Sequence, residues 1–192
     1  MIKLKNLTYR GRKAEIYDGK REKTARWQEE NRLAGEMLSG VKEVLDVPFG
    51  TGRMLKTYHK LKINYAGIDS SEEMLRQAYK KGARKNSLVI ADIFDANKRP
   101  PAVECVVCIR FLHLLEESNM LKALQIICSL AKRRVVLTIQ LGKRYIAGAH
   151  EVATHDEKKF RAAVKRSGWH VVRREQISRL GWCVVQLERG SR

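Results

Sequence analysis

Two glycines and two aspartates mark the ends of two predicted strands. An apolar run over 41–47 predicts a buried strand that contains Asp46, and Gly50 and Gly52 follow it before a helical pattern begins. Glycine at such a bend lets backbone N–H groups approach a bound ligand closely. The next apolar run ends in Asp69, where an acid can accept hydrogen bonds from ribose hydroxyls. These residues predict a binding site for a nucleotide-like cofactor.

Three later apolar runs extend the same pattern. The stretches 88–93, 104–110 and 134–139 each predict a buried strand, and Asp92 lies in the first of them. A single Asp at a strand end would be interpreted as a turn residue, but three of them in register favour a cofactor site. A nicotinamide-binding fold shares this logic, yet its fingerprint needs a third glycine where Leu55 stands.

Helical patterns fill the intervals between these strands. Apolar spacing predicts helices over 24–38, 72–81, 119–131 and 156–167, and the strands 168–172 and 182–187 are expected to form an antiparallel pair. Because strand and helix alternate up to the fifth strand, we expect a mostly parallel sheet with helices on both faces.

The order of these motifs resembles that of the class I S-adenosylmethionine-dependent methyltransferases, and it is closest to their small-molecule members. The resemblance rests on the acid and glycine turn of 46–52, on Asp69 and on the three later strands, and it covers most of the chain. It implies a Rossmann-like α/β fold, with a seven-stranded sheet in the order 3-2-1-4-5-7-6 and an antiparallel seventh strand. Residues 1–40 are then expected to be a helical segment that covers the cofactor site, and residues 41–192 the S-adenosylmethionine-binding domain.

The resemblance also implies roles around S-adenosyl-L-methionine (SAM), the expected cofactor. Gly50 and Gly52 would lie beside the methionine part, Asp46 near its ammonium group and Asp69 at the ribose hydroxyls. Asp92 and Ile93 would meet the adenine, Arg53 the carboxylate, and Tyr17 would act as a lid residue. A solvated arginine and a surface tyrosine that anchors the first helix are the alternatives for the last two. The implied cofactor-binding set is Tyr17, Asp46, Pro48, Phe49, Gly50, Gly52, Arg53, Asp69, Ser70, Asp92, Ile93 and Arg110.

Pro48 and Phe49 depart from the commonest form of the first motif, which has glycine and a small residue there. Proline fixes φ and removes a backbone donor, so we expect a stiffer turn. Phe49 is expected to pack near the cofactor.

The residues after the fourth strand are expected to face the methyl acceptor, because ligands bind beyond the carboxyl ends of parallel strands. Arg110 and His113 are the candidate catalytic residues there. His113 could act as a general base toward a hydroxyl acceptor, since the unperturbed pKa of histidine is near neutrality. A structural histidine that orients the loop is the alternative. Tyr145 and His150 lie in a later loop that could line the same pocket.

Charge points to an anionic partner. The 192 residues include 39 Lys and Arg against 21 Asp and Glu, a formal net charge of +18 that is spread along the chain. Such a surface favours a phosphorylated small molecule, an RNA backbone or a phospholipid headgroup. The Asn/Asp-Pro-Pro-aromatic motif of base-methylating enzymes is absent, because Ile109, Arg110, Phe111 and Leu112 stand at that position. A small-molecule acceptor is therefore expected ahead of RNA.

Three other classes stay open: an RNA methyltransferase, a non-catalytic SAM-binding protein, and an enzyme that breaks down SAM without an acceptor. All of them need the same cofactor pocket. A homodimer that completes the acceptor pocket is a further expectation.

The four cysteines are expected to be buried free thiols. Cys105 and Cys108 are three residues apart on a predicted strand, so their side chains point to opposite faces and do not form a metal clamp. The amino terminus lacks the apolar run of a signal peptide, and no stretch reaches the length of a spanning helix. We therefore expect a cytoplasmic protein without a transmembrane segment or a metal site.

Overall fold

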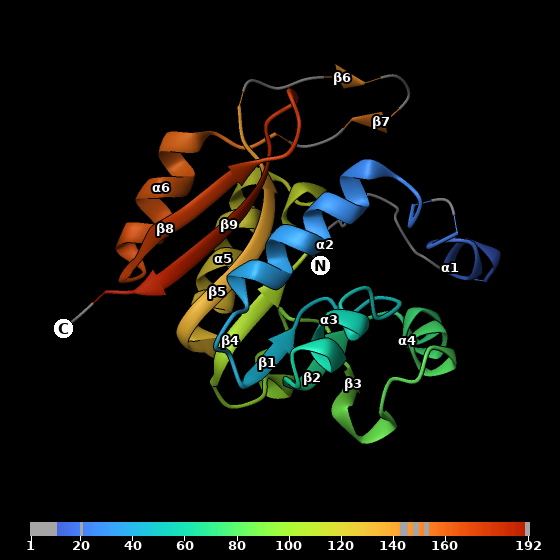
Figure 1. Ribbon diagram of the computed structural model, residues 1–192. Helices are drawn as coiled ribbons and strands as arrows, with labels where there is room; N and C mark the ends of the chain where they lie inside the picture. Colours follow the sequence, from blue (N-terminus) through green and yellow to red (C-terminus); the bar gives the residue numbers. More distant parts are fainter. Residues whose placement is uncertain (1–10, 20, 143–145, 148–149, 152–153, 191–192) are drawn as a thin grey trace.

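A twisted seven-stranded sheet forms the centre of the molecule (Figure 1). The computed structural model describes residues 11–19, 21–142, 146–147, 150–151 and 154–190. The strands of the sheet are β1 (Glu43–Asp46), β2 (Asn64–Asp69), β3 (Leu88–Ile90), β4 (Val103–Cys108), β5 (Ala131–Gln140), β8 (Trp169–Gln176) and β9 (Trp182–Arg189). Their order is β3-β2-β1-β4-β5-β9-β8. A separate two-stranded pair consists of β6 (Ile146–Ala147) and β7 (His150–Glu151).

The pairing directions agree with the predicted topology. β1 to β5 are joined by parallel ladders, β9 runs antiparallel to β5, and β8 runs antiparallel to β9. Within this sheet β8 and β9 are the sixth and seventh strands along the chain. The predicted order 3-2-1-4-5-7-6 with an antiparallel seventh strand is therefore confirmed.

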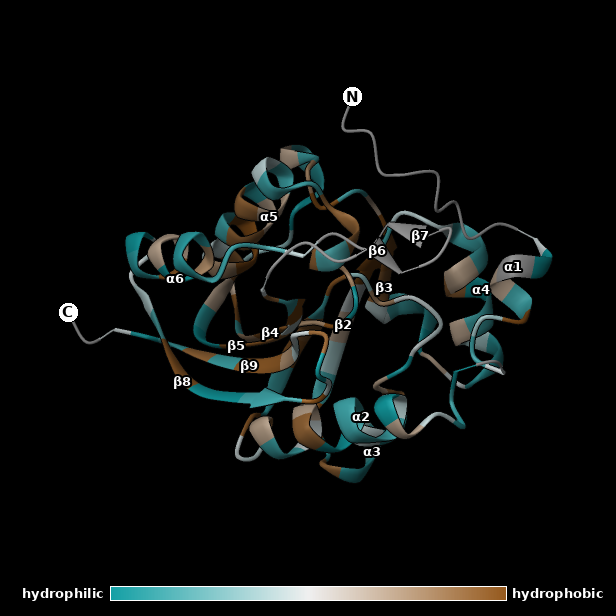
Figure 2. Cartoon of the chain, turned by 90° about the horizontal axis from the view of Figure 1, so that it is seen from above, coloured by the Kyte–Doolittle hydropathy of each residue, from teal (hydrophilic) through white to brown (hydrophobic). Residues whose placement is uncertain are grey.

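Helices cover both faces of the sheet (Figure 2). They are α1 (Arg12–Glu15), α2 (Ala25–Met37), α3 (Leu55–Lys60), α4 (Glu72–Lys80), α5 (Glu117–Leu130) and α6 (Glu157–Arg166), with short 3₁₀ turns at Lys85–Ser87, Ala96–Lys98 and Leu112–Leu114. Figure 2 shows α5 and α6 on one side of the sheet and α2 and α3 on the other. In the part of the chain that the structure describes, no helix has the length and apolar character needed to cross a membrane.

Neighbouring residues of a strand belong to two separate hydrophobic cores, one on each face of the sheet. Val44 packs with α2, α3 and α4, while the next residue, Leu45, packs with α5 and α6. Cys105 and Cys108 divide in the same way between the two cores, as the period of a strand requires. All four cysteines are free and buried, which confirms the prediction from their spacing. Within the described ranges, no cluster of three or more His, Cys, Asp or Glu side chains could hold a metal ion.

Polar caps explain where the predicted helices begin. The side chains of Thr24, Ser71 and Asp156 accept hydrogen bonds from backbone N–H groups in the first turns of α2, α4 and α6. Helix α5 begins at Glu117, two residues before the predicted start. Ala131, predicted to end that helix, is instead the first residue of β5. An abrupt change from helix to strand leaves no punctuating Gly or Pro for sequence reasoning to find.

Candidate active site

The turn after β1 requires its two glycines. Gly50 and Gly52 have φ values of 57° and 75°, a region that residues with a Cβ rarely adopt. A Cβ on Gly52 would lie 2.4 Å from the side chain of Leu55, the first residue of α3. The turn thus brings its backbone close to α3.

Phe49 belongs to the core beneath this turn and is only 2% exposed. Its ring stacks on Tyr65 with centroids 5.9 Å apart, and it fills the space over Gly67 of β2. Phe49 does not line the pocket described below, whereas its neighbour Pro48 does. The peptide bond between Val47 and Pro48 is cis.

Asp69 joins the glycine turn to the end of β2. One carboxylate oxygen accepts the N–H of Gly50 at 2.7 Å, and the other accepts the N–H of Ser71 at 2.8 Å. Burial raises the pKa of Asp69 to about 6, although the two backbone hydrogen bonds favour the charged form. Each carboxylate oxygen has a second lone pair, so Asp69 can also accept ribose hydroxyls.

Asp46 has different surroundings. Its carboxyl group is enclosed in the protein, where the hydroxyl of Tyr58 donates a hydrogen bond to it at 2.7 Å. Burial raises the pKa of Asp46 to about 8, so at neutral pH the group is mostly protonated. Asp46 does not line the pocket. Its hydrogen bond with Tyr58 holds α3 against β1.

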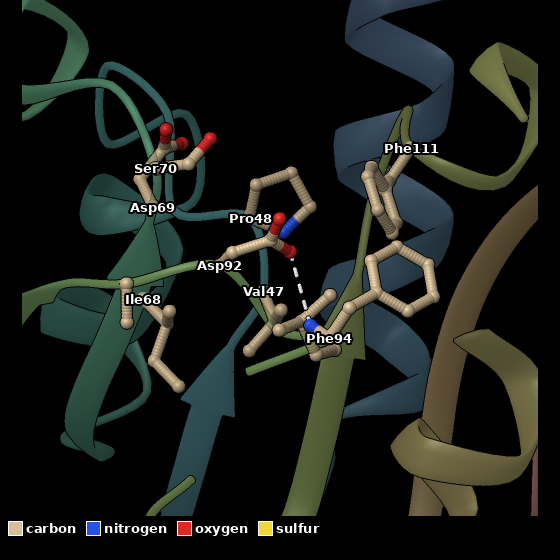
Figure 3. Close-up of a pocket in the computed structure, with 10 residues that line it drawn as sticks. Val47, Pro48, Ile68, Asp69, Ser70, Asp92, Phe94 and Phe111 are labelled. Carbon is tan, nitrogen blue, oxygen red and sulfur yellow. Dashed lines mark hydrogen bonds between the residues drawn. The ribbon is translucent and has the colours of Figure 1, made fainter. Parts of the chain in front are cut away.

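A pocket opens at the carboxyl ends of β1, β2 and β3 (Figure 3). Strand-end residues and the loop after β3 form its walls. In Figure 3 Asp69 and Ser70 lie on one side of Pro48, and Phe94 and Phe111 lie on the other. The Asp92 carboxylate accepts the N–H of Phe94 at 3.0 Å. The lining residues are Val47, Pro48, Ile68, Asp69, Ser70, Ala91, Asp92, Ile93, Phe94 and Phe111.

The pocket has the chemistry that a nucleoside needs. The Asp69 carboxylate stands on one side for hydroxyl groups, and two phenylalanine rings stand on the other for a flat base. The glycine turn is joined to this region by Gly50, whose N–H donates to the Asp69 carboxylate of the pocket lining. The residues present therefore fit the adenosine part of SAM.

Arg53 is bound by the first turns of α2 rather than by the pocket lining. Its guanidinium contacts Glu30 at 2.6 Å and Asn31 at 2.6 Å, and it lies over the Trp27 ring, 3.8 Å from the centroid. The side chain is only 9% exposed, and its Nη1 atom is buried without a hydrogen-bond partner. Arg53 is thus a core residue of the contact between α2 and the glycine turn.

The segment before α2 also contacts the turn. Asp18, which is buried, accepts a hydrogen bond from the hydroxyl of Thr51 at 2.8 Å and forms an ion pair with Lys81 of the loop after α4. Tyr17 packs against Trp27 with ring centroids 6.5 Å apart, and Arg21 lies over its ring.

Arg110 lies two residues after the end of β4 and has a left-handed conformation with φ 63°. Its N–H donates to the hydroxyl of Thr138 at 2.7 Å, which holds this backbone in place. The guanidinium lies over the Trp182 ring, 4.3 Å from the centroid, and contacts Glu30 at 3.3 Å. The structure therefore directs Arg110 toward α2 and β9.

His113 also contacts Trp182. Its ring is 4.6 Å from the Trp182 centroid, and its Nδ1 atom is buried without a partner. Burial and then repulsion by Arg110 lower the pKa of His113 well below its usual value. The imidazole is therefore neutral at physiological pH.

The structure brings Pro48, Asp69, Ser70, Asp92 and Ile93 of the predicted set into one pocket. Gly50, Gly52, Asp46 and Phe49 support the turn that borders it, and a second group around Trp182 contains Arg110 and His113. Tyr145 and the side chain of His150 lie outside the residues that the structure describes.

Sequence reasoning did not single out Asp18, Glu30, Phe94 or Trp182. The importance of Glu30 could have been inferred from the sequence, because Glu30 shares the apolar face of a predicted helix with Trp27, Leu33 and Met37. In the structure Glu30 is 1% exposed. A charge on such a face needs a buried partner. The role of Trp182 could not be inferred from the sequence, since its neighbours Arg26 and Arg110 come from α2 and from the segment after β4, which only the folded chain brings together.

The sheet order, the glycine turn and the pocket at the carboxyl edge define the class I methyltransferase fold. Residues 44–134 match the family model described as a methyltransferase domain, so the resemblance seen in the sequence is confirmed for this part of the chain. No curated protein matches the chain in sequence.

Solved structures give the same fold. The magnesium protoporphyrin IX methyltransferase ChlM from Synechocystis PCC 6803 with bound SAM has a TM-score of 0.69 at 18% identity, with 85% of this chain and 79% of that chain covered. The 1,6-didemethyltoxoflavin-N1-methyltransferase of Burkholderia thailandensis has a TM-score of 0.69 at 14% identity, with 93% and 85% covered. The [4+2]-cyclase SpnF also matches, with a TM-score of 0.66 at 13% identity and 84% and 81% covered. The fold thus occurs with more than one reaction, so the reaction must be argued from the site.

Proposed function

We propose that this protein is a SAM-dependent methyltransferase with a small-molecule acceptor. The pocket at the ends of β1, β2 and β3 carries the proposal, because it joins a glycine turn, ribose-type carboxylates and apolar rings at one edge of the sheet. The match of residues 44–134 to a methyltransferase domain supports the same function.

In this proposal Asp69 accepts the ribose hydroxyls, and Ile93, Phe94 and Phe111 enclose the adenine. Asp92 and Ser70 border the same groove. The buried Nη1 atom of Arg53 is an unused donor, which supports a contact with the cofactor carboxylate. The methionine part would then lie along the turn of Gly50 and Gly52, between this arginine and the pocket.

Residues 11–40 cover this end of the site in the proposal. Asp18 and Glu30 contact Thr51 and Arg53 on either side of Gly52, so the segment is tied directly to the glycine turn. Tyr17 packs on Trp27 next to these contacts, which supports its role as a lid residue.

SAM, when bound, would supply an electrophilic sulfonium methyl group, which an electron-rich acceptor atom would take as the methyl–sulfur bond breaks and S-adenosylhomocysteine is released. The protein needs mainly to orient the acceptor and to exclude water. His113 is proposed to accept the acceptor proton at Nδ1, because that atom is buried, unpartnered and on a neutral imidazole.

An RNA acceptor is the second candidate, favoured by the net charge of +18. It predicts binding that weakens steeply with salt. A cytoplasmic location fits either acceptor, because four buried free thiols suit a reducing compartment. A homodimer would show as a doubled mass in solution.

The test is to incubate the purified protein with methyl-labelled SAM and a panel of phosphorylated metabolites, carboxylic acids and RNA, and to follow products by mass spectrometry. The proposal expects label on a small molecule together with stoichiometric S-adenosylhomocysteine. Label on RNA alone would support the second candidate. Loss of SAM without any acceptor would indicate a SAM-degrading enzyme, and intact SAM throughout would favour a non-catalytic binding protein.

A further inference from the structure

Two arginines lie over the Trp182 ring, and a third lies over Trp27 and shares the Glu30 carboxylate with one of them. We call Arg26, Arg53 and Arg110 the arginine cluster. The guanidinium groups of Arg110 and Arg26 both lie over the Trp182 ring, 4.3 Å and 5.3 Å from its centroid. Trp182 is 3% exposed, so it orients the two side chains rather than offering a free face to a ligand.

One buried acid serves this cluster. Glu30 is 1% exposed, and its two oxygens contact Arg53 at 2.6 Å and Arg110 at 3.3 Å. The ion pairs among the described residues give Arg26 no carboxylate partner of its own within 4.0 Å. Three positive charges thus share one negative charge.

The surplus charge acts on neighbouring groups. Burial and then repulsion by Arg110 lower the pKa of Arg26, and burial also lowers the pKa of Arg53, with Arg110 adding to the effect. Clustered like charges at a partly buried place are unfavourable unless an opposite charge joins them. An anion bound there would therefore be stabilised by more than one guanidinium.

Unused donor and acceptor atoms border the cluster. The Nη1 atom of Arg53 and the Nδ1 atom of His113 are both buried without a partner. The strained backbone at Arg110, with φ 63°, is a further cost at this place. These features are typical of a binding site rather than of a closed core.

The cluster also adjoins the cofactor pocket. Arg110 directly precedes Phe111, which lines that pocket, and Arg53 directly follows Gly52 of the turn. A group held between Arg26 and Arg110 would therefore be next to the pocket and next to His113. This is the side from which an acceptor would approach beyond the end of β4.

We propose that Arg26 and Arg110, oriented on Trp182, bind a carboxylate or phosphate group of the methyl acceptor. This inference rests on the proposed function, and it narrows the acceptor to an anion. The planar guanidinium of Arg110 suits such a group, because it can donate two parallel hydrogen bonds to carboxylate or phosphate oxygens. Glu30 holds Arg110 in position through their ion pair at 3.3 Å.

The test uses inorganic phosphate as the probe, titrated into the full chain with and without saturating S-adenosylhomocysteine. Arg110→Gln and Arg26→Gln are the test variants. Arg32→Gln is the matched control, since Arg32 lies on the same helix as Arg26 but pairs with Glu29 and Glu36 on an exposed face. We expect saturable phosphate binding by the wild type and by Arg32→Gln, and affinity lower by about tenfold or more in both test variants.

A second titration separates the acceptor from the cofactor as the source of the anion. It compares S-adenosylhomocysteine with methylthioadenosine, which lacks the amino-acid part. We expect both test variants to bind both nucleosides as the wild type does. If Arg110→Gln weakens S-adenosylhomocysteine alone, the cluster binds the cofactor carboxylate and the acceptor assignment is wrong.

Equal phosphate affinity in all four proteins would overturn the proposal outright. Arg26 is exposed, so Arg26→Gln keeps the test valid if the more buried Arg110→Gln fails to fold. A different result would contradict the proposed function. A wild type that binds phosphate but neither nucleoside would contradict the use of SAM and would still support the anion site.

Discussion

Asp46 and Asp69 end neighbouring strands, yet their carboxyl groups differ in what they can do. Asp69 accepts two backbone N–H groups and still lines the pocket, with a pKa raised to about 6. Asp46 accepts the Tyr58 hydroxyl and is enclosed, with a pKa raised to about 8. The sequence places both acids at strand ends but contains no direct sign of this difference, which comes from burial.

Asp69→Ala should weaken binding of S-adenosylhomocysteine by about 1–3 kcal/mol, because ribose hydroxyls would lose their buried acceptor. Titration calorimetry measures this change. Asp95→Ala is the control, since Asp95 caps the 3₁₀ turn at Ala96–Lys98 outside the pocket lining. Equal affinity of Asp69→Ala and the wild type would remove Asp69 from the site.

Asp46→Asn should make the stability of the protein less dependent on pH. The folded-state pKa of Asp46 is above its unfolded value, so at this group the folded state binds more protons, and the contribution of Asp46 to stability falls as the pH rises from about 4 toward 8. Asparagine can still accept the Tyr58 hydroxyl but does not titrate. In urea unfolding, the free energy of unfolding of Asp46→Asn relative to that of the wild type should therefore rise by up to about 1.4 kcal/mol per pH unit over that range. Parallel curves for the two proteins would show that Asp46 is charged when folded.

His113→Ala should lower turnover by about a hundredfold if His113 is the base. Because the pKa of His113 is well below 6.5, the base form is already present at pH 6.5, so wild-type turnover should not change with His113 ionisation between pH 6.5 and 8. His59→Ala, on the exposed part of α3, is the control. Unchanged turnover in His113→Ala, with the acceptor found by the labelled assay, would reject the base role.

The turn after β1 and the strand β2 are fitted to one another. Phe49 replaces the small residue that is common in the first motif, and Gly67 leaves room for its ring. The unusual residue at 49 is evident from the sequence, but its partner is not, because the contact depends on the parallel register of β1 and β2. The sequence predicts the existence of these elements through apolar periodicity and caps, whereas side-chain pairs between elements require the fold.

Gly67→Ala should destabilise the protein by about 1–3 kcal/mol, since the new Cβ would lie 2.3 Å from the Phe49 ring. In a Phe49→Ala background the same substitution should cost clearly less. Thermal or urea unfolding of the wild type, the two single variants and the double variant measures the coupling energy between the two substitutions. The remaining close contact, with Leu88 at 2.8 Å, is the same in both backgrounds. Additive effects would mean that Phe49 and Gly67 are not fitted to each other.

Helix α2 links the two parts of the candidate site. Glu30 joins Arg53, which follows the glycine turn, to Arg110, which follows β4. The predicted bounds of this helix were close to the observed Ala25–Met37, and its capping residue Thr24 was included in the predicted segment. The convergence of Arg26 and Arg110 on Trp182 could not be predicted, because Trp182 is far from both of them in sequence.

At the scale of the whole molecule, the chain combines a nucleoside-type pocket with a strong positive charge. The net charge of +18 is a property of composition and would attract any anion, whereas the arginine cluster is a specific arrangement of side chains oriented by aromatic rings and by Glu30. Only the second can select one acceptor geometry over another. Long-range charge therefore accounts for the attraction of anionic partners, and the site accounts for their orientation.

The most direct test of the central claim is calorimetric titration of the purified protein with SAM, followed by mass spectrometry of the same sample. We expect saturable binding at one site per chain, with SAM intact in the absence of an acceptor. Absence of binding would contradict the assignment of the pocket, and breakdown of SAM without an acceptor would contradict methyl transfer as the reaction.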